Sequence, residues 1–181
     1  MLWEKQHQPA KMPPHFDIRL ATVADALLVG DHRARMFRDM ELVPDDLFDS
    51  YRARCETRLR EMLQSREYVG WLASPAGQPD KIVAGAGVQL RHVLPHPTGE
   101  PPEITIAEGR HAIIINVFTE PEWRRRGLAT LLLHQIIAWA RKERLDRLVL
   151  HASDEGRSVY ERLGFIQANE MRFGDRLDRL E

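Results

Sequence analysis

A nearly continuous apolar run, followed at once by a tight turn and a helix, constrains the fold of this chain most. The segment His111 to Glu120 contains Ile113, Ile114, Ile115, Val117 and Phe118. Such a run is typical of a central strand that is buried on both faces of a sheet. Pro121 to Arg126 predicts the turn, and Gly127 to about Glu143 predicts the helix. We therefore expect a buried strand–turn–helix unit, covered on both sides by the rest of the chain.

The flanking segments predict the elements that cover this unit. Between Leu94 and Gly109 the chain holds four prolines and two glycines, so we expect a long loop there, and long loops in compact domains are commonly functional. Apolar periodicity and breaker residues predict strands at Phe16–Leu20, Tyr68–Ala73, Ile82–Val93 and Asp146–Ala152, helices at Thr22–Met40, Pro44–Ser65 and Glu155–Leu163, a strand from Phe165 and one more at Met171–Phe173. Together these elements form a mixed α/β domain around one sheet, over residues 15–181, after a flexible N-terminal extension of residues 1–14.

Composition excludes several classes of protein. The 181 residues carry a formal net charge of −1, which argues against a protein that coats nucleic acid. Cys55 is the single cysteine, so no intramolecular disulfide forms, and no two histidines have metal-ligand spacing on a helix. We predict no metal, no membrane contact and a cytoplasmic location, because neither a membrane span nor a signal peptide is found. Met1 and Met12 both remain candidates for the native start.

The turn before the predicted helix carries the pattern Arg124-x-x-Gly127-x-Ala129. The first amides of a helix have no partner inside it, and the helix dipole adds positive charge at that end. Gly127 and Ala129 are small enough for a phosphate to approach the backbone, and three consecutive arginines add charge. The pattern equally describes a solvated basic turn. It is neither the phosphate loop of nucleotide hydrolases nor the dinucleotide-binding glycine pattern.

Two motifs in order resemble the GNAT acetyltransferases, the Gcn-five-related superfamily. Arg124-x-x-Gly127-x-Ala129 is similar to the pyrophosphate-binding motif of that family. The stretch His151 to Phe165 is similar to its later motif, in which a tyrosine, here Tyr160, precedes Gly-Phe by four residues. The resemblance covers Phe16 to Phe173. It implies a mostly antiparallel sheet of six to seven strands, splayed between strands four and five, with about four flanking helices.

The resemblance also implies a co-substrate, acetyl-CoA, and a reaction in which a primary amine attacks the acetyl group directly in a ternary complex. The pantetheine arm would add to the sheet at a bulge near Asn116 to Phe118, and the turn amides would hold the pyrophosphate. The cofactor-binding residues carried over from the family are Val117, Phe118, Thr119, Arg124, Arg125, Arg126, Gly127, Leu128, Ala129, Thr130, Ser153 and Tyr160.

Catalytic roles follow from the same resemblance. Tyr160 matches the general acid that protonates the departing thiolate, although it could instead pack its helix on the sheet. Many relatives place a glutamate on the strand before the turn, but the corresponding stretch here, Ala112 to Ile115, has no carboxylate. The general base is therefore open, and the alternatives are Asn116 holding a water, His111, Glu103 and Glu120.

The acceptor amine is a small molecule or a peptide. Arg35 and Phe37 belong to the stretch Arg35 to Arg38, where relatives line the acceptor pocket, and the arginines suit an acceptor with a carboxylate or phosphate. An exposed helix face is the alternative. Cys55 lies in an apolar stripe and is expected to be a core thiol. A homodimer is common among proteins of this kind. The rival functions are an acyl-CoA sensor without catalysis and a nucleic-acid-binding domain that uses Arg124 to Arg126.

Overall fold

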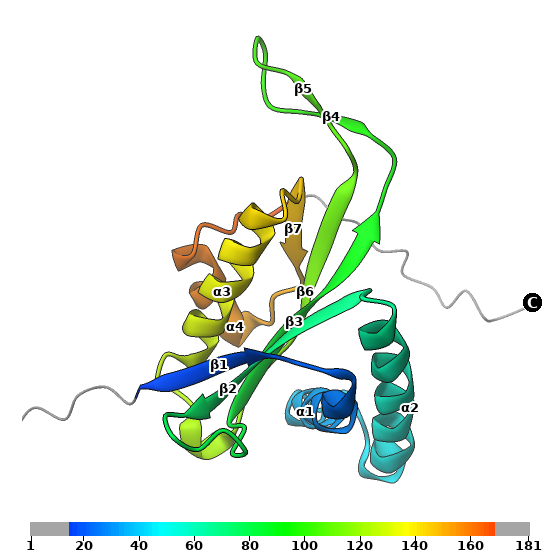
Figure 1. The fold of residues 1–181 in the computed structure, drawn as a ribbon, viewed down its shortest axis with the longest axis vertical. Coiled ribbons are helices and arrows are strands. Elements are labelled where there is room, and N and C mark those ends of the chain that lie inside the picture. The colour runs from blue at the N-terminus through cyan, green and yellow to red at the C-terminus, as the bar shows by residue number, and fades with distance from the viewer. Residues whose placement is uncertain (1–14, 169–181) are drawn as a thin grey trace, which may run out of the picture. The chain divides into compact units, whose positions relative to one another are not determined.

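The computed structural model describes residues 15–168, which divide after His151 into two compact units. The first unit contains every strand of the described residues and three of the α-helices, and the second contains one helix (Figure 1). The predicted extension of residues 1–14 and the predicted strand Met171–Phe173 lie outside the described residues. No helix between residues 15 and 168 is long and apolar enough to cross a membrane.

The main sheet has five strands in the order β1-β2-β3-β6-β7. The pairs β1–β2, β2–β3 and β3–β6 are antiparallel, and β6–β7 is parallel. The bounds are β1 Phe16–Leu20, β2 Tyr68–Pro75, β3 Ala84–His92, β6 Arg110–Thr119 and β7 Arg147–Leu150. The predicted fold class, a mixed α/β domain with a mostly antiparallel sheet, is confirmed.

Four α-helices and two short 3-10 helices complete the described fold. The helix α2 begins directly after Pro44 with two acidic residues in its first turn, as the helix dipole favours. Ahead of α1, the backbone N–H of Thr22 donates to the Asp25 carboxylate at 2.7 Å, the contact expected of a capping box. The bounds are η1 Val23–Asp25, α1 Ala26–Asp39, α2 Asp45–Gln64, η2 Pro121–Trp123, α3 Leu128–Lys142 and α4 Asp154–Arg162.

Both faces of the sheet in the first unit are covered. Successive side chains of a strand point to opposite faces. On β2, Trp71 contacts Trp139 of α3, with ring centroids 5.4 Å apart. The next residue, Leu72, belongs to a core cluster with Val29 of α1 and Leu59 of α2. The helix α3 therefore lies on one face of the sheet, and α1 and α2 lie on the other (Figure 1).

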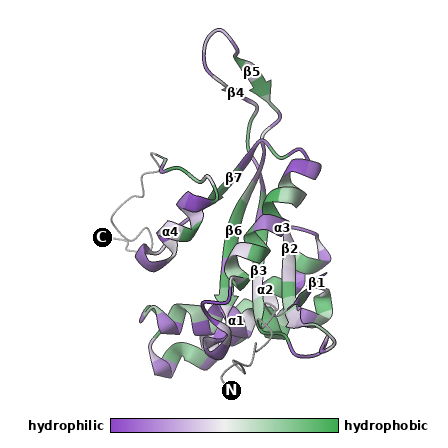
Figure 2. Cartoon of the chain, turned by 90° about the vertical axis from the view of Figure 1, so that its left-hand side faces the viewer, coloured by the Kyte–Doolittle hydropathy of each residue, from purple (hydrophilic) through white to green (hydrophobic). Residues whose placement is uncertain are grey.

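The strand β6 is the apolar centre predicted from the sequence. Its residues Ala112, Ile113, Ile114 and Phe118 are all buried, and the strand is hydrophobic along most of its length (Figure 2). On the neighbouring β3, an added Cβ at Gly87 would lie 2.1 Å from the Tyr68 hydroxyl oxygen. Gly87 thus gives the Tyr68 ring its place in the core, which fixes how β2 and β3 pack beside β6.

Two predictions of local structure are corrected. The stretch from Leu94 to Gly109, predicted as a loop, contains a separate two-stranded sheet, β4 His96–Thr98 with β5 Thr105–Ala107. Both strands of such a pair are edge strands, which tolerate Pro97 because an edge residue can leave its N–H side unpaired. The strand predicted from Phe165 is absent over residues 165–168.

Candidate active site

A β-bulge lies in β6 where the resemblance predicts it. The register with β3 pairs Ile115 with Gly87 but Phe118 with Gly85, so two β6 residues oppose Ala86 alone. Asn116, the first of these two residues, has φ of 59°. A bulge of this kind re-aims the backbone of its strand. The backbone of β6 therefore changes direction at Asn116 and Val117.

Beyond the bulge, β6 has an open edge on the side of β7. The parallel pairing ends at Ile114 with Leu150, while β6 continues to Thr119. The N–H of Glu120 bonds to Val83 on the β3 side, at 2.9 Å. Because alternate residues of a strand turn their backbone groups to opposite edges, those of Val117 and Thr119 point away from β3. The splay between the fourth and fifth strands of the sheet is thus present.

The turn that follows presents a row of unpaired backbone N–H groups. Arg125 and Gly127 both have left-handed backbone conformations, with φ of 60° and 81°. The first helical bond of α3 runs from the N–H of Leu131 to the carbonyl of Gly127, at 2.9 Å. Within the described part of the chain no group accepts a hydrogen bond from the amides of residues 125–130. Successive amides in such a turn form a concave anion-binding surface, at the positive end of a helix.

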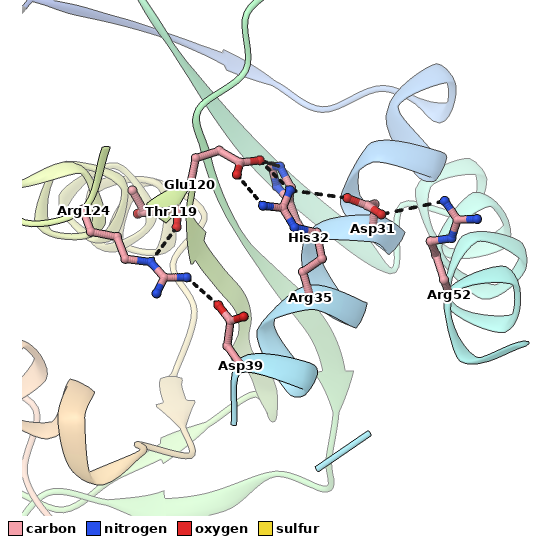
Figure 3. Close-up of polar contacts among 8 residues, drawn as sticks. All are labelled: Asp31, His32, Arg35, Asp39, Arg52, Thr119, Glu120 and Arg124. Atoms are coloured by element: carbon pink, nitrogen blue, oxygen red, sulfur yellow. Dashed lines mark hydrogen bonds and ion pairs between the residues drawn. The ribbon is translucent and has the colours of Figure 1, made fainter. Parts of the chain in front are cut away.

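The three arginines of the turn have different surroundings. Arg124 donates from Nε to the carbonyl of Thr119, at 3.1 Å, and from Nη2 to the Asp39 carboxylate at the end of α1 (Figure 3). Arg126 bonds to the carbonyl of Glu122 and lies 4.7 Å from the ring centroid of Trp123. Arg125 is exposed. Arg124 is therefore engaged within the protein, whereas Arg125 and Arg126 keep their charges without a carboxylate partner among residues 15–168.

Glu120, directly after β6, is held by α1. Its carboxylate accepts two hydrogen bonds from Arg35, at 2.7 and 2.5 Å, and lies 3.8 Å from Nε2 of His32 (Figure 3). Asp31 lies 3.6 Å from Arg35 and 3.8 Å from Arg52 of α2. Arg35, predicted to bind the acceptor, is thus already paired with carboxylates. That role for Arg35 stays a prediction, and an incoming anion would have to compete with Glu120.

His32 is a buried member of this group that the sequence did not indicate. Its side chain is 2% exposed and packs on the Phe118 ring, with centroids 4.8 Å apart. Burial lowers its pKa to about 4, against the opposing effect of the Glu120 carboxylate. His32 is consequently neutral at pH 7, and its charged sequence neighbours, Asp31 and Arg33, give no sign that its side chain is buried.

The Asn116 side chain is fixed on both of its polar atoms. Its Oδ1 accepts from Nη1 of Arg33 at 2.6 Å, and its Nδ2 donates to the Tyr68 hydroxyl at 3.4 Å. Burial raises the pKa of Tyr68 to about 12, so this hydroxyl stays protonated. Asn116 itself is 3% exposed. The arrangement suits a side chain that holds the bulge in place, and Arg33 and Tyr68 are contributors that the sequence did not indicate.

The remaining candidates in the first unit lie in varied settings. Phe37 meets the Tyr51 ring edge-on, with centroids 5.9 Å apart, between α1 and α2. The ring of His111 lies 5.0 Å from that of His96, and Glu103 is exposed in the hairpin turn. Cys55 is buried in the core. No group of three His, Cys, Asp or Glu side chains in residues 15–168 could hold a metal ion.

The second unit carries the later motif on a short helix. Ser153 caps α4, since its hydroxyl accepts from the N–H of Gly156 at 3.2 Å. Tyr160 contacts the Phe165 ring edge-on, with centroids 6.1 Å apart. Burial raises the pKa of the Tyr160 hydroxyl above its ordinary value. Tyr160 therefore carries its proton at neutral pH, as a general acid must at the start of a reaction.

Comparison with solved structures gives the same fold. An N-acetyltransferase of Ralstonia eutropha, described as GCN5-related, matches with a TM-score of 0.74 and 25% identity over 88% of this chain and 97% of its own. A predicted acetyltransferase of Clostridium acetobutylicum, solved with acetyl-CoA, matches with 0.75 and 25% over 92% and 100%. The aminoglycoside N-acetyltransferase AAC(6')-Iy, in complex with CoA, matches in fold at 0.61 and 19% over 93% and 99%.

Sequence comparison places the chain in a family. No curated protein sequence shows significant similarity to it. The family model described as the acetyltransferase (GNAT) family matches residues 36–165, which include the turn at Arg124 to Thr130 and Tyr160. That match spans well over half of the 181 residues. The chain belongs to the GNAT acetyltransferase family.

Proposed function

We propose that this protein is an N-acetyltransferase that moves the acetyl group of acetyl-CoA to a primary amine by direct attack in a ternary complex. The observation that carries the proposal is the open edge of β6 next to the unpaired amides of residues 125–130. One edge offers strand-like hydrogen bonds, and the other surface attracts an anion. In acetyl-CoA, the pantetheine arm needs hydrogen bonds of the kind a strand edge offers, and the pyrophosphate that follows it needs an anion-binding surface.

The proposal gives individual roles to the residues of this site. The backbone groups of Val117 and Thr119 bond the pantetheine amides, in the manner of an added strand. The Thr119 carbonyl is already bonded to Arg124, which leaves the Thr119 N–H and the Val117 carbonyl for the pantetheine amides. The amides of residues 125–130 hold the pyrophosphate, and Arg125 and Arg126 add charge. Arg124 acts by fixing the end of β6, and Leu128 to Thr130 act through their backbone.

Acetyl-CoA supplies a thioester whose carbonyl carbon the amine attacks, and free CoA leaves. The N–H of Val117 points to the open edge of β6 and stabilises the negative charge that develops on the carbonyl oxygen. Tyr160 donates its proton to the departing sulfur. We propose that the amine loses its proton to water before it attacks, because Asn116 and Glu120 are both bonded within the protein. A cytoplasmic enzyme, active as a monomer or homodimer, is consistent with this proposal.

The test is turnover by the full-length protein. Thiol release would be followed with acetyl-CoA and a mixed panel of amines: amino acids, amino-acid amides, polyamines, aminoglycosides and short peptides. Mass spectrometry of the products would then identify an acceptor that has gained one acetyl group on nitrogen. Thiol release without an acetylated amine would contradict transfer to nitrogen. No release with any amine in the panel would also contradict it, and would favour an acyl-CoA sensor.

A further inference from the structure

The charged side chains of arginines on α1 and α2 differ in whether a carboxylate lies close enough to form an ion pair with them. Arg35 is paired with Glu120 and Asp31, and Arg52 lies near Asp31 and Asp49. Arg38 and Arg54 are exposed and have no carboxylate partner among residues 15–168, and Arg33 differs from both in its burial. It is half-buried, and no carboxylate of residues 15–168 lies within ion-pair distance of it. A guanidinium removed from water without an anion loses hydration that nothing in the protein replaces by charge.

Neutral groups surround Arg33 on several sides. Its Nη1 donates to Oδ1 of Asn116 at 2.6 Å, and its guanidinium carbon lies 4.8 Å from the ring centroid of Phe37. Burial raises the pKa of the Tyr51 hydroxyl, and the positive charge of Arg33 beside it acts in the opposite direction. Phe37 and Tyr51 thus flank a cation that has hydrogen-bonding partners but no counter-ion.

The position of this cation relates it to the reaction. Asn116 is the first residue of the bulge, and Val117 follows it directly. In the proposed reaction the acetyl group lies beside Val117. A group bound by Arg33 is therefore held one side chain away from the amine that attacks. The Phe37 ring over the guanidinium restricts it to a plane, which favours paired hydrogen bonds to a planar anion.

We propose that the acceptor is an amino acid, a primary amine with a free carboxylate, and that Arg33 binds this carboxylate. The inference rests on the proposed function. The oxygens of a phosphate accept hydrogen bonds as those of a carboxylate do, but the second negative charge of a phosphate needs a second cation. The neighbouring Arg35 is already paired with Glu120, so a single negative charge matches the site better.

Matched substrates test the inference without the need to know the side chain of the acceptor. Values of kcat/KM would be measured for the twenty common L-amino acids and for the matching amino-acid amides, with saturating acetyl-CoA. A charge-assisted contact predicts that the best acid exceeds its amide by about 10- to 100-fold. Equal values for acid and amide, or turnover of amides and polyamines alone, would overturn the inference.

Substitution assigns the preference to Arg33. In Arg33→Gln the acid-to-amide ratio should fall to near one, through a higher KM for the acid. Arg33→Lys should keep part of the wild-type acid-to-amide ratio. The exposed Arg54 of α2 provides the control, and Arg54→Gln should keep the wild-type ratio. A ratio within one preparation does not depend on its folded fraction, so a partly unfolded variant still gives an answer. Equal losses for acid and amide would mean that Arg33 only supports Asn116.

The two levels of the proposal fail differently. If acetyl-CoA neither binds nor is consumed, the proposed acetyltransferase is wrong. If amines without a carboxylate are acetylated as well as amino acids, only the role of Arg33 is wrong. If acetyl-CoA binds and no amino acid is acetylated, the amino-acid acceptor is excluded while cofactor binding stands.

Discussion

Arg124, in the turn after β6, bonds to Asp39, the last residue of α1, and also to the carbonyl of Thr119 (Figure 3). One side chain thereby links the proposed cofactor turn to the helix that carries Arg33 and Arg35. Both charged side chains are nearly half exposed, at 46% and 44%. Solvent screening makes such a pair weak, so its importance lies in geometry more than in stability.

Substitutions that remove the ion pair between Arg124 and Asp39 should affect the affinity for acetyl-CoA more than the free energy of unfolding. Arg124→Ala and Asp39→Ala should each change the free energy of unfolding by less than about 1 kcal/mol. Arg124→Ala should weaken acetyl-CoA binding more than Asp39→Ala, because only Arg124 also holds the Thr119 carbonyl. Urea denaturation and calorimetric titration measure the two quantities. Equal affinity losses in both variants would show that the ion pair, and not the strand contact, carries the effect.

Gly127 offers a test of the turn conformation with a matched control. Its φ of 81° is strained for alanine, and nothing lies within 4 Å of an added Cβ. Gly77, in the turn after β2, has φ of 75° and equally open space. Gly127→Ala and Gly77→Ala should both destabilise the fold by about 1 kcal/mol. Only Gly127→Ala should weaken acetyl-CoA binding. A similar loss of affinity in Gly77→Ala would contradict the assignment of the turn.

Tyr160→Phe tests the general acid. The variant should keep its affinity for acetyl-CoA and lose about 100-fold or more in kcat, the usual contribution of a positioned acid. In the wild type, the raised pKa of Tyr160 predicts that any fall in rate from its ionisation occurs at higher pH than for an exposed tyrosine. Rapid-quench or steady-state kinetics from pH 6 to 10 give both results. An unchanged kcat in the variant would show that Tyr160 is not the general acid and that it only packs its helix.

Glu120→Gln distinguishes a structural partner of Arg35 from a general base. The substitution keeps the shape but leaves the Arg35 charge less well balanced, so stability should fall by about 1–3 kcal/mol. The pH dependence of kcat/KM should keep its shape, because Glu120 transfers no proton in the proposed reaction. Disappearance of an acid limb that the wild type shows would identify Glu120 as the base.

His32 predicts a specific loss of stability in acid. The pKa of His32 in the folded protein, about 4, lies below the ordinary histidine value of 6.5, so the unfolded chain takes up a proton more readily. Stability is complete above about pH 6.5 and declines as the pH falls toward 4, by up to about 3 kcal/mol from this group. Denaturation curves of the wild type and His32→Gln should show a smaller decline over this range in the variant. An equal decline of stability with pH in the two proteins would contradict the lowered pKa of His32.

The sequence predicted those parts of the fold that depend on local patterns. The apolar run of β6, the breakers around Pro121 and Gly127, and the periodicity of α2 each lie within a few residues. The hairpin β4–β5 was missed because its prolines and glycines suggest a loop, and its pairing is set by register rather than propensity.

The site was less accessible to prediction for a different reason. Arg33 and Asn116 are 83 residues apart in the chain, and Tyr68 and Asn116 are 48 apart. Arg35 was predicted to be available for the acceptor, but its partner Glu120 lies 85 residues away. Contacts of this kind arise when strands and helices pack, so no spacing within the sequence reveals which arginine stays without a carboxylate. The roles assigned to Ser153 and Tyr160 remain predictions from the motif.

The most direct test of the central claim is thermal unfolding of the full-length protein with acetyl-CoA, and with adenosine diphosphate as the control. A ligand at about a hundredfold its Kd stabilises the folded state by about 2.7 kcal/mol. For a chain of this size we expect a rise in Tm of about 5–10 °C with acetyl-CoA, larger than the rise with adenosine diphosphate. No rise at millimolar acetyl-CoA would contradict the cofactor site, and with it the proposed transfer.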